Sequence, residues 1–332
     1  MKNQLNLEKK KEIRLLIRDG LFSTILSLFT CYLLSLFFFN TSFFNPLTKA
    51  LKDFSFLDVY YAERLDENET VDTDIILINI EHQDRMALAL ALQEILRTKP
   101  KVVGFDIILK EFEETPADTL LAKLLKEDKV VGAYIKNSDA TETRNHPFFQ
   151  GSGTSGFVNF NFDFENTVVR EFTGTHKMKD SHDEAFAVKL ARKYLSKSVW
   201  EKKNLERRFS SSRFINYKGD LNRFLNLTID EFMAMEDKSI FSGKAVLMGY
   251  LGSPTGNPYD VEDKHFSPLN ATTAGKSIPD MYGLVIHANI LSMILSDSFM
   301  FKISKFWTLF LMFVRGIALM FCMRKSFWTI NV

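Results

Sequence analysis

The feature that most constrains the fold of this sequence is an uncharged apolar run near its N-terminus. Residues 20–48 contain no Asp, Glu, Lys or Arg, and residues 21–39 read LFSTILSLFTCYLLSLFFF. As a helix rising ~1.5 Å per residue, this run would extend about 28 Å, close to the thickness of a bilayer's hydrocarbon core. Lysines and arginines outnumber acidic residues before it, which keeps that end of a chain in the cytoplasm. The run predicts a transmembrane anchor at residues 21–45 after a cytoplasmic N-terminus at residues 1–20.

A cleaved signal peptide is the alternative interpretation of this run. The apolar core of a signal peptide is shorter and ends in small residues. Here the run ends in Phe37, Phe38 and Phe39, followed by Asn40. The sequence therefore favours an uncleaved anchor.

A second apolar run lies close to the C-terminus. Residues 306–323 read FWTLFLMFVRGIALMFCM, and a basic pair follows them directly. The run is just long enough to span a bilayer, although Arg315 near its middle costs about 2.5–3.5 kcal/mol on insertion scales. Arg315 would face a partner helix or mark a re-entrant break. We predict a second transmembrane helix at residues 306–323 and a cytoplasmic tail at residues 324–332.

Charge balance and cysteine content exclude two classes of protein. Lys and Arg number 42 and Asp and Glu 41, so the formal net charge of +1 provides no overall field for nucleic acid. The only cysteines, Cys31 and Cys322, fall within the two predicted spans. The region between the spans therefore has no disulfide and no cysteine metal site. A nucleic-acid-binding protein and a cysteine-stapled ectodomain are both disfavoured.

Residues 70–300 alternate strand and helix patterns. Short β-branched runs predict strands and stretches of strong helix formers lie between them, in the order 75–80, 86–96, 102–109, 118–125 and 130–135. This β-α-β-α-β order predicts an α/β fold with a mostly parallel sheet flanked by helices. The strands are too uniformly apolar to have a wet face, and we expect these residues in the core: Ile76, Ile78, Val103, Phe105, Ile107, Val131, Val246 and Leu247.

The second half of this region adds a different pattern before returning to the first. Residues 157–164 alternate apolar and polar side chains, as a half-solvated strand does, and residues 168–172 are its expected hairpin partner. We also expect a helix at 184–195, strands at 214–217 and 245–250, and an apolar helix at 284–295. Since no internal repeat or low-complexity linker interrupts it, we predict one extracytoplasmic domain between two transmembrane helices.

Six segments of this region, in this order, have a familiar sequence: GFDIIL (104–109), GFVNF (156–160), TVVREF (167–172), GKAVLMGY (243–250), EDKHFSPLN (262–270) and PDMYGLVIHANILSMIL (279–295). Together they resemble the CHASE type 2 (CHASE2) family, and the last segment is the most specific of them. The resemblance extends over residues 71–297. It implies an extracytoplasmic sensory domain of a bacterial protein in the inner (cytoplasmic) membrane that takes part in signal transduction.

The resemblance has two departures. The chain has Glu81-His82-Gln83-Asp84-Arg85 after the first strand, where the family commonly has a Trp-Pro-rich segment. In that family a cytoplasmic cyclase, kinase or histidine-kinase module often follows the membrane helices, and this chain contains no such effector. The resemblance therefore implies a sensor that relies on a signalling partner, or a gene clipped after the first helix that follows the sensor.

Candidate ligand-binding residues follow the central strands. Asp106 ends one apolar strand, and the loop containing Gly249, Gly252 and Gly256 follows another. Loops after strands of an open α/β sheet converge on the edge where ligands bind, and the loop amides could cradle an anion. Arg85 would supply the counter-charge to Asp106 or to an anionic ligand. The plainer interpretations are a structural Asp106, bonded to loop amides or to Arg85, and an ordinary glycine-rich turn.

Three further groups have both a functional and a plain interpretation. His287 and Asn289 belong to the family-like helix that leads toward the second span; His287 is either a ligand or pH sensor, or a satisfied core histidine. The cluster of Asp260, Glu262, Asp263 and His265 could bind a hard cation or form a solvated acidic loop. The loop pattern of an EF-hand is absent, so we predict no metal site.

We interpret the chain as a membrane-anchored, non-catalytic sensory or ligand-binding module, in which a stimulus shifts the population of two conformations. It has no G-x-S-x-G, H-E-x-x-H or Cys–His motif, so we predict no catalytic residue and no cofactor. Its expected partners are the lipid bilayer, an unknown small ligand and a cytoplasmic or membrane signalling protein. A homodimer is one alternative for its oligomeric state, and a nucleic-acid partner is not expected. The alternative is a structural or partner-docking cell-envelope protein.

Overall fold

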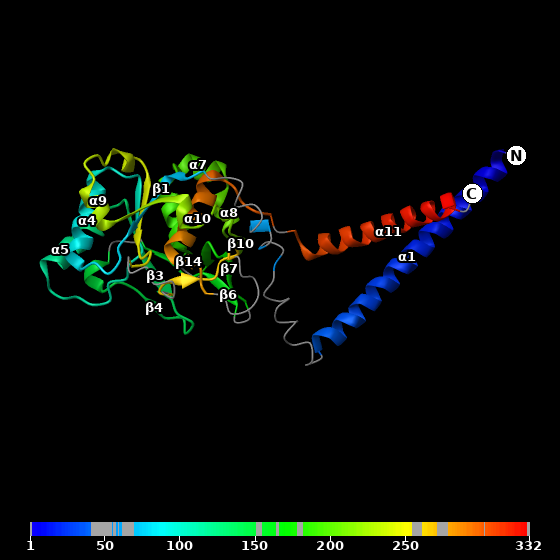
Figure 1. Ribbon diagram of the computed structural model, residues 1–332, viewed down its shortest axis with the longest axis horizontal. Helices are drawn as coiled ribbons and strands as arrows, with labels where there is room; N and C mark the ends of the chain where they lie inside the picture. Colours follow the sequence, from blue (N-terminus) through cyan, green and yellow to red (C-terminus); the bar gives the residue numbers. More distant parts are fainter. Residues whose placement is uncertain are drawn as a thin grey trace. The chain divides into compact units, whose positions relative to one another are not determined.

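Two compact units make up the chain, Met1–Leu51 with Phe301–Val332 and Lys52–Met300. The second is called the sheet domain below. The computed structural model describes all residues except 1, 41–54, 56–57, 59, 62–69, 151–154, 164–165, 178–181, 254–260, 271–277, 302 and 331–332. Figure 1 follows the chain from one end to the other, and each unit is described by itself.

The sheet domain is built on a parallel sheet. Its strands run in the order β11 (Phe224–Thr228), β1 (Asp72–Asn79), β12 (Ala245–Gly249), β2 (Val102–Phe105) and β3 (Val130–Lys136), and β5 (Ser155–Phe157) also pairs with β3. All of these pairs are parallel, whereas β4 (Glu142–Thr143) is antiparallel to β3. The predicted α/β architecture with a mainly parallel sheet is confirmed.

Side chains of the central strands divide between two apolar cores. Ile76 and Ile78 of β1 lie in one core with α4 (Arg85–Arg97), α5 (Pro116–Leu124) and α9 (Ile229–Ala234). Ile75 and Leu77 lie in the other with α6 (Phe186–Tyr194) and α10 (Gly283–Ser296). Figure 1 shows α4, α5 and α9 on one side of the sheet and α10 on the other. The domain therefore has three layers, helices–sheet–helices, and apolar cores cover both faces of the sheet.

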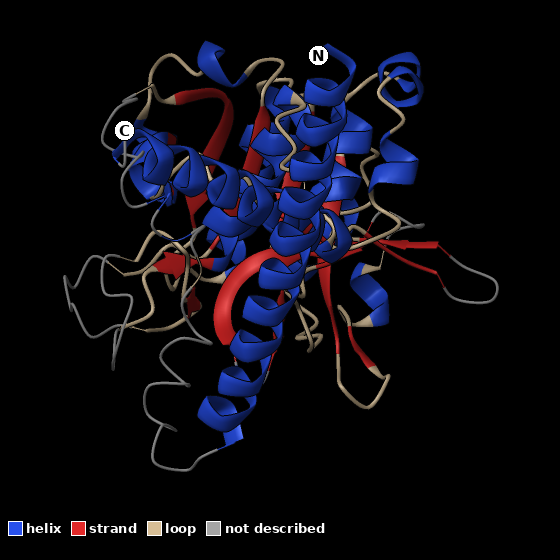
Figure 2. Cartoon of the chain, turned by 90° about the vertical axis from the view of Figure 1, so that its right-hand side faces the viewer, coloured by secondary structure: helices blue, strands red, loops and turns tan. Residues whose placement is uncertain are grey.

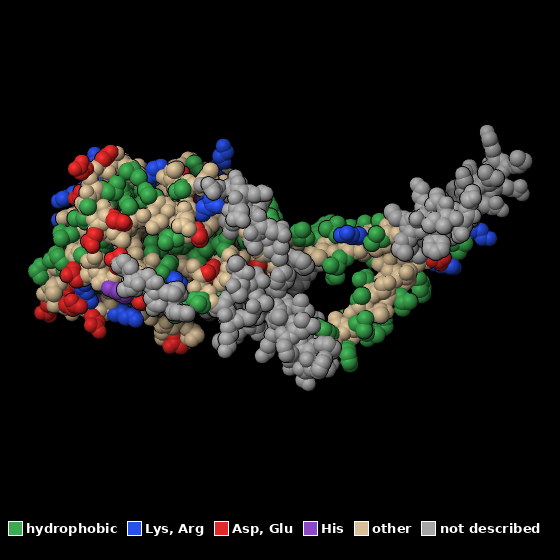
Figure 3. Space-filling model, in the orientation of Figure 1, with side chains coloured by type: hydrophobic (Ala, Val, Ile, Leu, Met, Phe, Trp, Pro, Cys, Tyr) green, Lys and Arg blue, Asp and Glu red, His purple; other side chains and the backbone are tan. Residues whose placement is uncertain are grey.

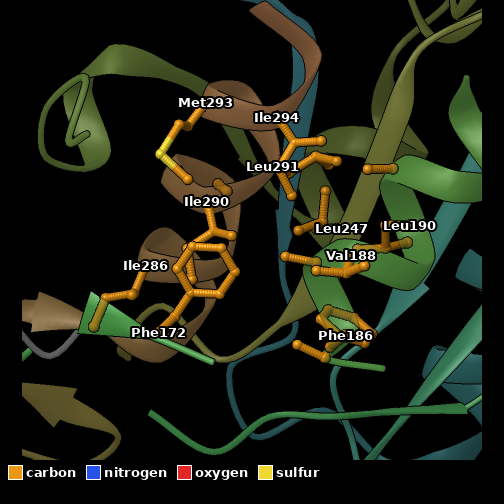
Figure 4. Packing of buried hydrophobic residues seen from close by; sticks show 14 of the residues in the cluster. Phe172, Phe186, Val188, Leu190, Leu247, Ile286, Ile290, Leu291, Met293 and Ile294 are labelled. Atoms are coloured by element: carbon orange, nitrogen blue, oxygen red, sulfur yellow. The ribbon is translucent and has the colours of Figure 1, made fainter. Parts of the chain in front are cut away.

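Helix α10 is the most deeply buried helix of the sheet domain. Every residue from Gly283 to Ile294 is buried, so the helix has no polar face exposed to water. Figure 4 shows Leu291 and Ile294 of α10 turned toward Leu247 of β12 and Val188 of α6, whereas Ile286 and Ile290 lie beside Phe172. It ends where Asp297 adopts a left-handed conformation with φ 58°. A helix that is apolar all round needs this two-sided burial.

The helices on the other face begin with side-chain caps. The Asp84 carboxylate accepts a hydrogen bond from the Ala87 N–H at the start of α4, and the Thr115 hydroxyl caps α5. Thr228 and Glu231 form a reciprocal capping box at the start of α9. Such caps satisfy amides that have no partner within the helix and typically contribute about 1 kcal/mol each.

Smaller elements complete the domain (Figure 2). One three-stranded sheet has the order β10 (Arg213–Phe214), β7 (Asn166–Phe172) and β6 (Asn161–Asp163), and two-stranded pairs join β8 (Thr175–Lys177) to β9 (His182–Glu184) and β13 (Lys264–His265) to β14 (Met281–Tyr282). The short helices are α7 (Lys197–Lys202), α8 (Leu205–Arg208), η2 (Pro147–Phe149), η3 (Leu221–Arg223) and η4 (Ser239–Phe241). The predicted hairpin of residues 168–172 with the preceding strand is confirmed by the antiparallel β6–β7 pair.

Several predicted boundaries were wrong. The strand predicted at residues 102–109 ends at Phe105, and Ile107 is half-buried rather than in the core. The other seven predicted core residues are buried. Residues 157–164 contain the separate strands β5 and β6, because β5 joins the main sheet while β6 pairs with β7. The strand expected at 214–217 is only the two residues of β10.

The other unit contains two long helices, α1 (Lys2–Asn40) and α11 (Lys305–Ile330). Within α1, Ile17–Phe38 is long and apolar enough to cross a membrane. It is the one such helix among the described residues, and in α11 the apolar stretch that the structure describes is the shorter Phe306–Leu319. The predicted second transmembrane helix therefore stays a prediction.

The two long helices pack closely at Gly316 of α11. A Cβ added to Gly316 would lie 3.1 Å from Thr24 Cγ2 of α1, so the glycine permits this close approach.

Candidate functional site

The candidate site lies at the carboxyl edge of the central strands, where Asn79 ties two loops together. Its Oδ1 accepts hydrogen bonds from the amides of Glu81 (3.0 Å) and Leu251 (2.9 Å), and its Nδ2 donates to the Gly252 carbonyl (2.8 Å). The loops after β1 and β12 are therefore fixed to each other at this edge. Asn79 was not among the predicted residues, although a polar residue within the run IILINI was a usable signal.

Asp106 directly follows β2 at the same edge. Its amide donates to the Met248 carbonyl at 2.8 Å, which extends the sheet by one bond. Its carboxyl is half-buried, and among the described residues it accepts no hydrogen bond and forms no ion pair. Burial, together with the negative charge of Asp263, raises the pKa of Asp106 to about 7. Near neutral pH, a carboxyl with this pKa can exchange a proton with a ligand or accept a hydrogen bond from it.

Asp263 lies at the start of α10. It adopts a left-handed conformation with φ 53°, and its carbonyl accepts a hydrogen bond from the Gly283 amide at 3.0 Å. The Asp263 carboxylate oxygens lie 3.2 and 3.3 Å from the position that a Cβ at Gly283 would take. Residue 263 is exposed, as expected for an acidic loop, yet its carboxyl lies against the first turn of the buried helix. The sequence did not reveal that this loop turns one carboxyl toward Asp106.

The glycines of this edge allow close packing. A Cβ at Gly249 would lie 3.2 Å from the Asp106 Cβ and 3.0 Å from a Leu284 methyl carbon. Gly252 has φ +95°, and a Cβ there would lie 2.3 Å from the Tyr282 hydroxyl. The structure thus places Gly249 against Asp106 and Gly252 against Tyr282, and their role in binding a ligand stays a prediction. Gly256 lies outside the described residues, and the anion cradle stays a prediction.

Three aromatic side chains of the loops at this edge contact one another. The rings of Tyr250 and Tyr282 lie 6.1 Å apart, and His82 lies 5.4 Å from Tyr250. His82 is also 3.9 Å from the Glu262 carboxylate, and the Lys264 ammonium lies over the Tyr282 ring at 4.9 Å. In Figure 3 acidic and basic side chains are interspersed over the visible face of the sheet domain, so no charge of one sign dominates that face.

Arg85 does not supply a counter-charge to Asp106, so that alternative was wrong, and its role toward an anionic ligand stays a prediction. Its guanidinium donates to Asp118 at 2.8 Å and lies 3.1 Å from Glu113. Arg85 is the first residue of α4, and from there its side chain reaches the first turn of α5 rather than the sheet edge. Burial raises the pKa of Asp118, but the hydrogen bonds from Arg85 and from the Glu113 amide outweigh it and hold the pKa below its usual range.

His287 lies in the core rather than at the sheet edge. It is 3% exposed, and its ring lies 4.7 Å from Phe160 and 5.3 Å from Phe186. Its Nδ1 has no hydrogen-bond partner in the part of the chain that the structure describes, so it is not the satisfied core histidine of the plain interpretation. Burial, assisted by His265, lowers the pKa of His287 to about 3, and the ring is neutral at physiological pH.

Asn289 has a clear structural role. Its Oδ1 accepts from the amides of Lys218 (2.7 Å) and Gly219 (3.3 Å). Its Nδ2 donates to the carbonyls of Gly219 and Val285, both at 2.9 Å. The buried amide is therefore fully used in joining α10 to residues 218–219. Within the described residues no group of three or more His, Cys, Asp or Glu could hold a metal ion.

Comparisons with known proteins identify one family. The family model described as "CHASE2 domain" matches residues 32–323, which is most of the chain. No curated protein and no solved structure matches it.

Proposed function

The chain belongs to the CHASE2 domain family, a family of extracytoplasmic sensory domains, and we propose that it is a non-catalytic sensor anchored in the inner membrane. The observation that carries this proposal is the half-buried Asp106 carboxyl, which has no partner among the described residues and lies at the ligand-binding edge of a parallel sheet. The apolar helix Ile17–Phe38 supports the anchor. The partners that we propose are the lipid bilayer, a small ligand and a separate signalling protein.

The position of α10 supports a mechanism for such a sensor. The helix begins at Gly283, against the Asp263 carboxylate, and Leu284 in its first turn contacts Gly249. A ligand that binds Asp106 with Asp263 would therefore act on the start of a helix that is buried on all sides. A ligand shifts a conformational equilibrium only by its difference in affinity for the two states. Helix α10 is the element that would differ between them.

We predict the membrane topology that this function requires. Residues 46–302 should be extracytoplasmic, since basic residues flank both apolar runs on the same side. A reporter fused near Ser138 should be active only as an extracytoplasmic reporter, and fusions before residue 20 and after residue 324 only as cytoplasmic ones. A cytoplasmic signal at Ser138 would contradict the assignment of the sensor to the outside.

The ligand site is tested with Asp106→Asn in the full chain, held in a lipid nanodisc. Small metabolites and cations are screened for those that raise the melting temperature of the wild-type protein, because a ligand that binds only the folded state stabilises it. Asp106→Asn should remain folded and lose that rise. Asp139→Asn, which removes an exposed carboxyl elsewhere, should retain it. An unchanged response of Asp106→Asn would place the ligand at another site.

A further inference from the structure

The two ends of the sheet domain meet at one buried hydroxyl. Tyr61, near the start of the domain, is 2% exposed, and its hydroxyl donates to the Ile215 carbonyl at 2.7 Å. The same oxygen accepts a hydrogen bond from the Tyr217 amide at 3.2 Å. Met300, the last residue of the domain, places its sulfur 3.1 Å from that oxygen. The start and the end of the domain, which lead in sequence to the two predicted spans, therefore share one polar contact.

A buried ion pair holds the start of the domain in place. The described residues here are Ser55, Asp58, Tyr60 and Tyr61, called the N-terminal connector below. Asp58 and Arg170 of β7 form a bidentate pair with distances of 2.9 and 2.7 Å, and their side chains are 5% and 8% exposed. The Ser55 amide adds a bond to the same carboxylate at 3.1 Å. Paired charges at this depth are costly to separate, so the connector is fixed to β7.

Residues 215–219, called the bridge below, hold the other end as well. The Asn216 side chain donates to the Ser298 carbonyl at 2.8 Å, and its amide donates to the Met293 sulfur at 3.3 Å. Residues 295–300, called the C-terminal connector below, are also held by the ion pair between Arg208 and Asp297 at 2.7 Å. The bridge therefore contacts both connectors through neighbouring residues.

The bridge is also bonded to the helix that begins at the candidate site. The Lys218 and Gly219 amides both donate to the Asn289 side chain in the middle of α10, and Asn289 donates back to the Gly219 carbonyl. A displacement of α10 would thus act on residues 218–219, which directly follow the residues that are bonded to Tyr61 and Ser298.

We propose that Tyr61 and the bridge form a joint that fastens the two connectors to each other and to α10, so that both are displaced together. Its use in signalling rests on the proposed function, but the joint exists without a ligand. Tyr61 is bonded to the bridge and contacts Met300, and the bridge is bonded to Ser298, so opening either connector breaks contacts of the other. The two connectors should therefore open as one cooperative unit.

The test is hydrogen exchange of the full chain in nanodiscs, without ligand, read by mass spectrometry. Tyr61→Phe keeps the ring and removes the hydroxyl, and it should speed exchange in both connectors on the order of tenfold. The matched control is Tyr134→Phe, the same substitution at another tyrosine that is 2% exposed. Tyr134 lies in β3, where its ring contacts Phe157 and the Arg144 guanidinium rather than the bridge, so the variant should leave both connectors unchanged.

Three outcomes would overturn the joint. They are faster exchange of the N-terminal connector alone in Tyr61→Phe, unchanged exchange of both connectors, and an equal effect of the two variants on the C-terminal connector. If Tyr61→Phe does not fold, the wild-type protein decides: under increasing urea both connectors should show the same opening free energy and the same slope. Different slopes would refute the joint. Because no ligand is present, these results are independent of whether Asp106 binds one.

Discussion

Val246→Asp is expected to abolish accumulation of the folded chain. Val246 is 0% exposed in the middle of β12, where it pairs with Ile76 on one side and Val103 on the other. A carboxylate at this position would be surrounded by the apolar core that α4 and α9 cover, with no counter-charge. Burying such a group costs several kcal/mol, a large part of the ~5–15 kcal/mol that stabilises a typical domain.

The measurement is the yield of monodisperse protein after detergent extraction and size-exclusion chromatography. Val71→Asp is the matched control: the same substitution at a residue that is 49% exposed, just before β1, should give a wild-type yield. Normal yield and normal melting of Val246→Asp would show that β12 does not lie at the centre of the sheet.

The parallel sheet could be predicted because its strands are apolar on both faces. Ile75 and Leu77 face one core while Ile76 and Ile78 face the other, so the run shows no polar alternation and cannot lie at a wet surface. The edge strand β11 lacked this signal, because FLNLT contains Asn226 and ends in Thr228, where α9 is capped. Only pairing with β1, far away in sequence, makes this short segment a strand.

The candidate site could be predicted only as far as strand ends determine it. Asp106 and Gly249 end neighbouring parallel strands, and the topology alone brings them to one edge. The partner of Arg85 depended instead on the direction of a side chain at the start of α4, which sequence position does not fix. Asp263 reaches the site through a loop with a left-handed residue, and no periodic pattern marks such a turn.

Asp106→Asn is expected to stabilise the protein strongly at pH 7.5 and much less at pH 4.5. The folded state raises the pKa of Asp106 from an ordinary value of 3.8 to about 7. Between these values the folded state binds the proton that the unfolded state releases. This contribution to stability is fully present below pH 3.8 and is lost as the pH rises to 7. Asparagine carries no charge at either pH, so the variant avoids that loss.

The size of the effect follows from the same shift. At ~1.36 kcal/mol per pH unit, the span from 3.8 to about 7 corresponds to at most about 4 kcal/mol. Screening of a half-buried carboxyl reduces this to roughly 2 kcal/mol. In a domain of this size, roughly 2 kcal/mol raises the melting temperature by about 4–8 °C. Calorimetry of both proteins at the two pH values measures the difference directly.

The stability of the wild type alone would not isolate the effect of Asp106, because His287 also titrates differently in the folded and unfolded states. Its folded pKa of about 3 lies below the ~6.5 of a free histidine, so its contribution has the opposite sign: it is present above pH 6.5 and lost as the pH falls toward 3. In the wild type alone the two effects partly cancel, but His287 is the same in both proteins and drops out of their difference.

If Asp106→Asn instead lowers the melting temperature equally at both pH values, Asp106 is a structural carboxylate whose hydrogen bonds support the fold. A gain that is much larger at pH 7.5 than at pH 4.5 would mean that the domain keeps, at a cost in stability, a charge that a ligand could satisfy.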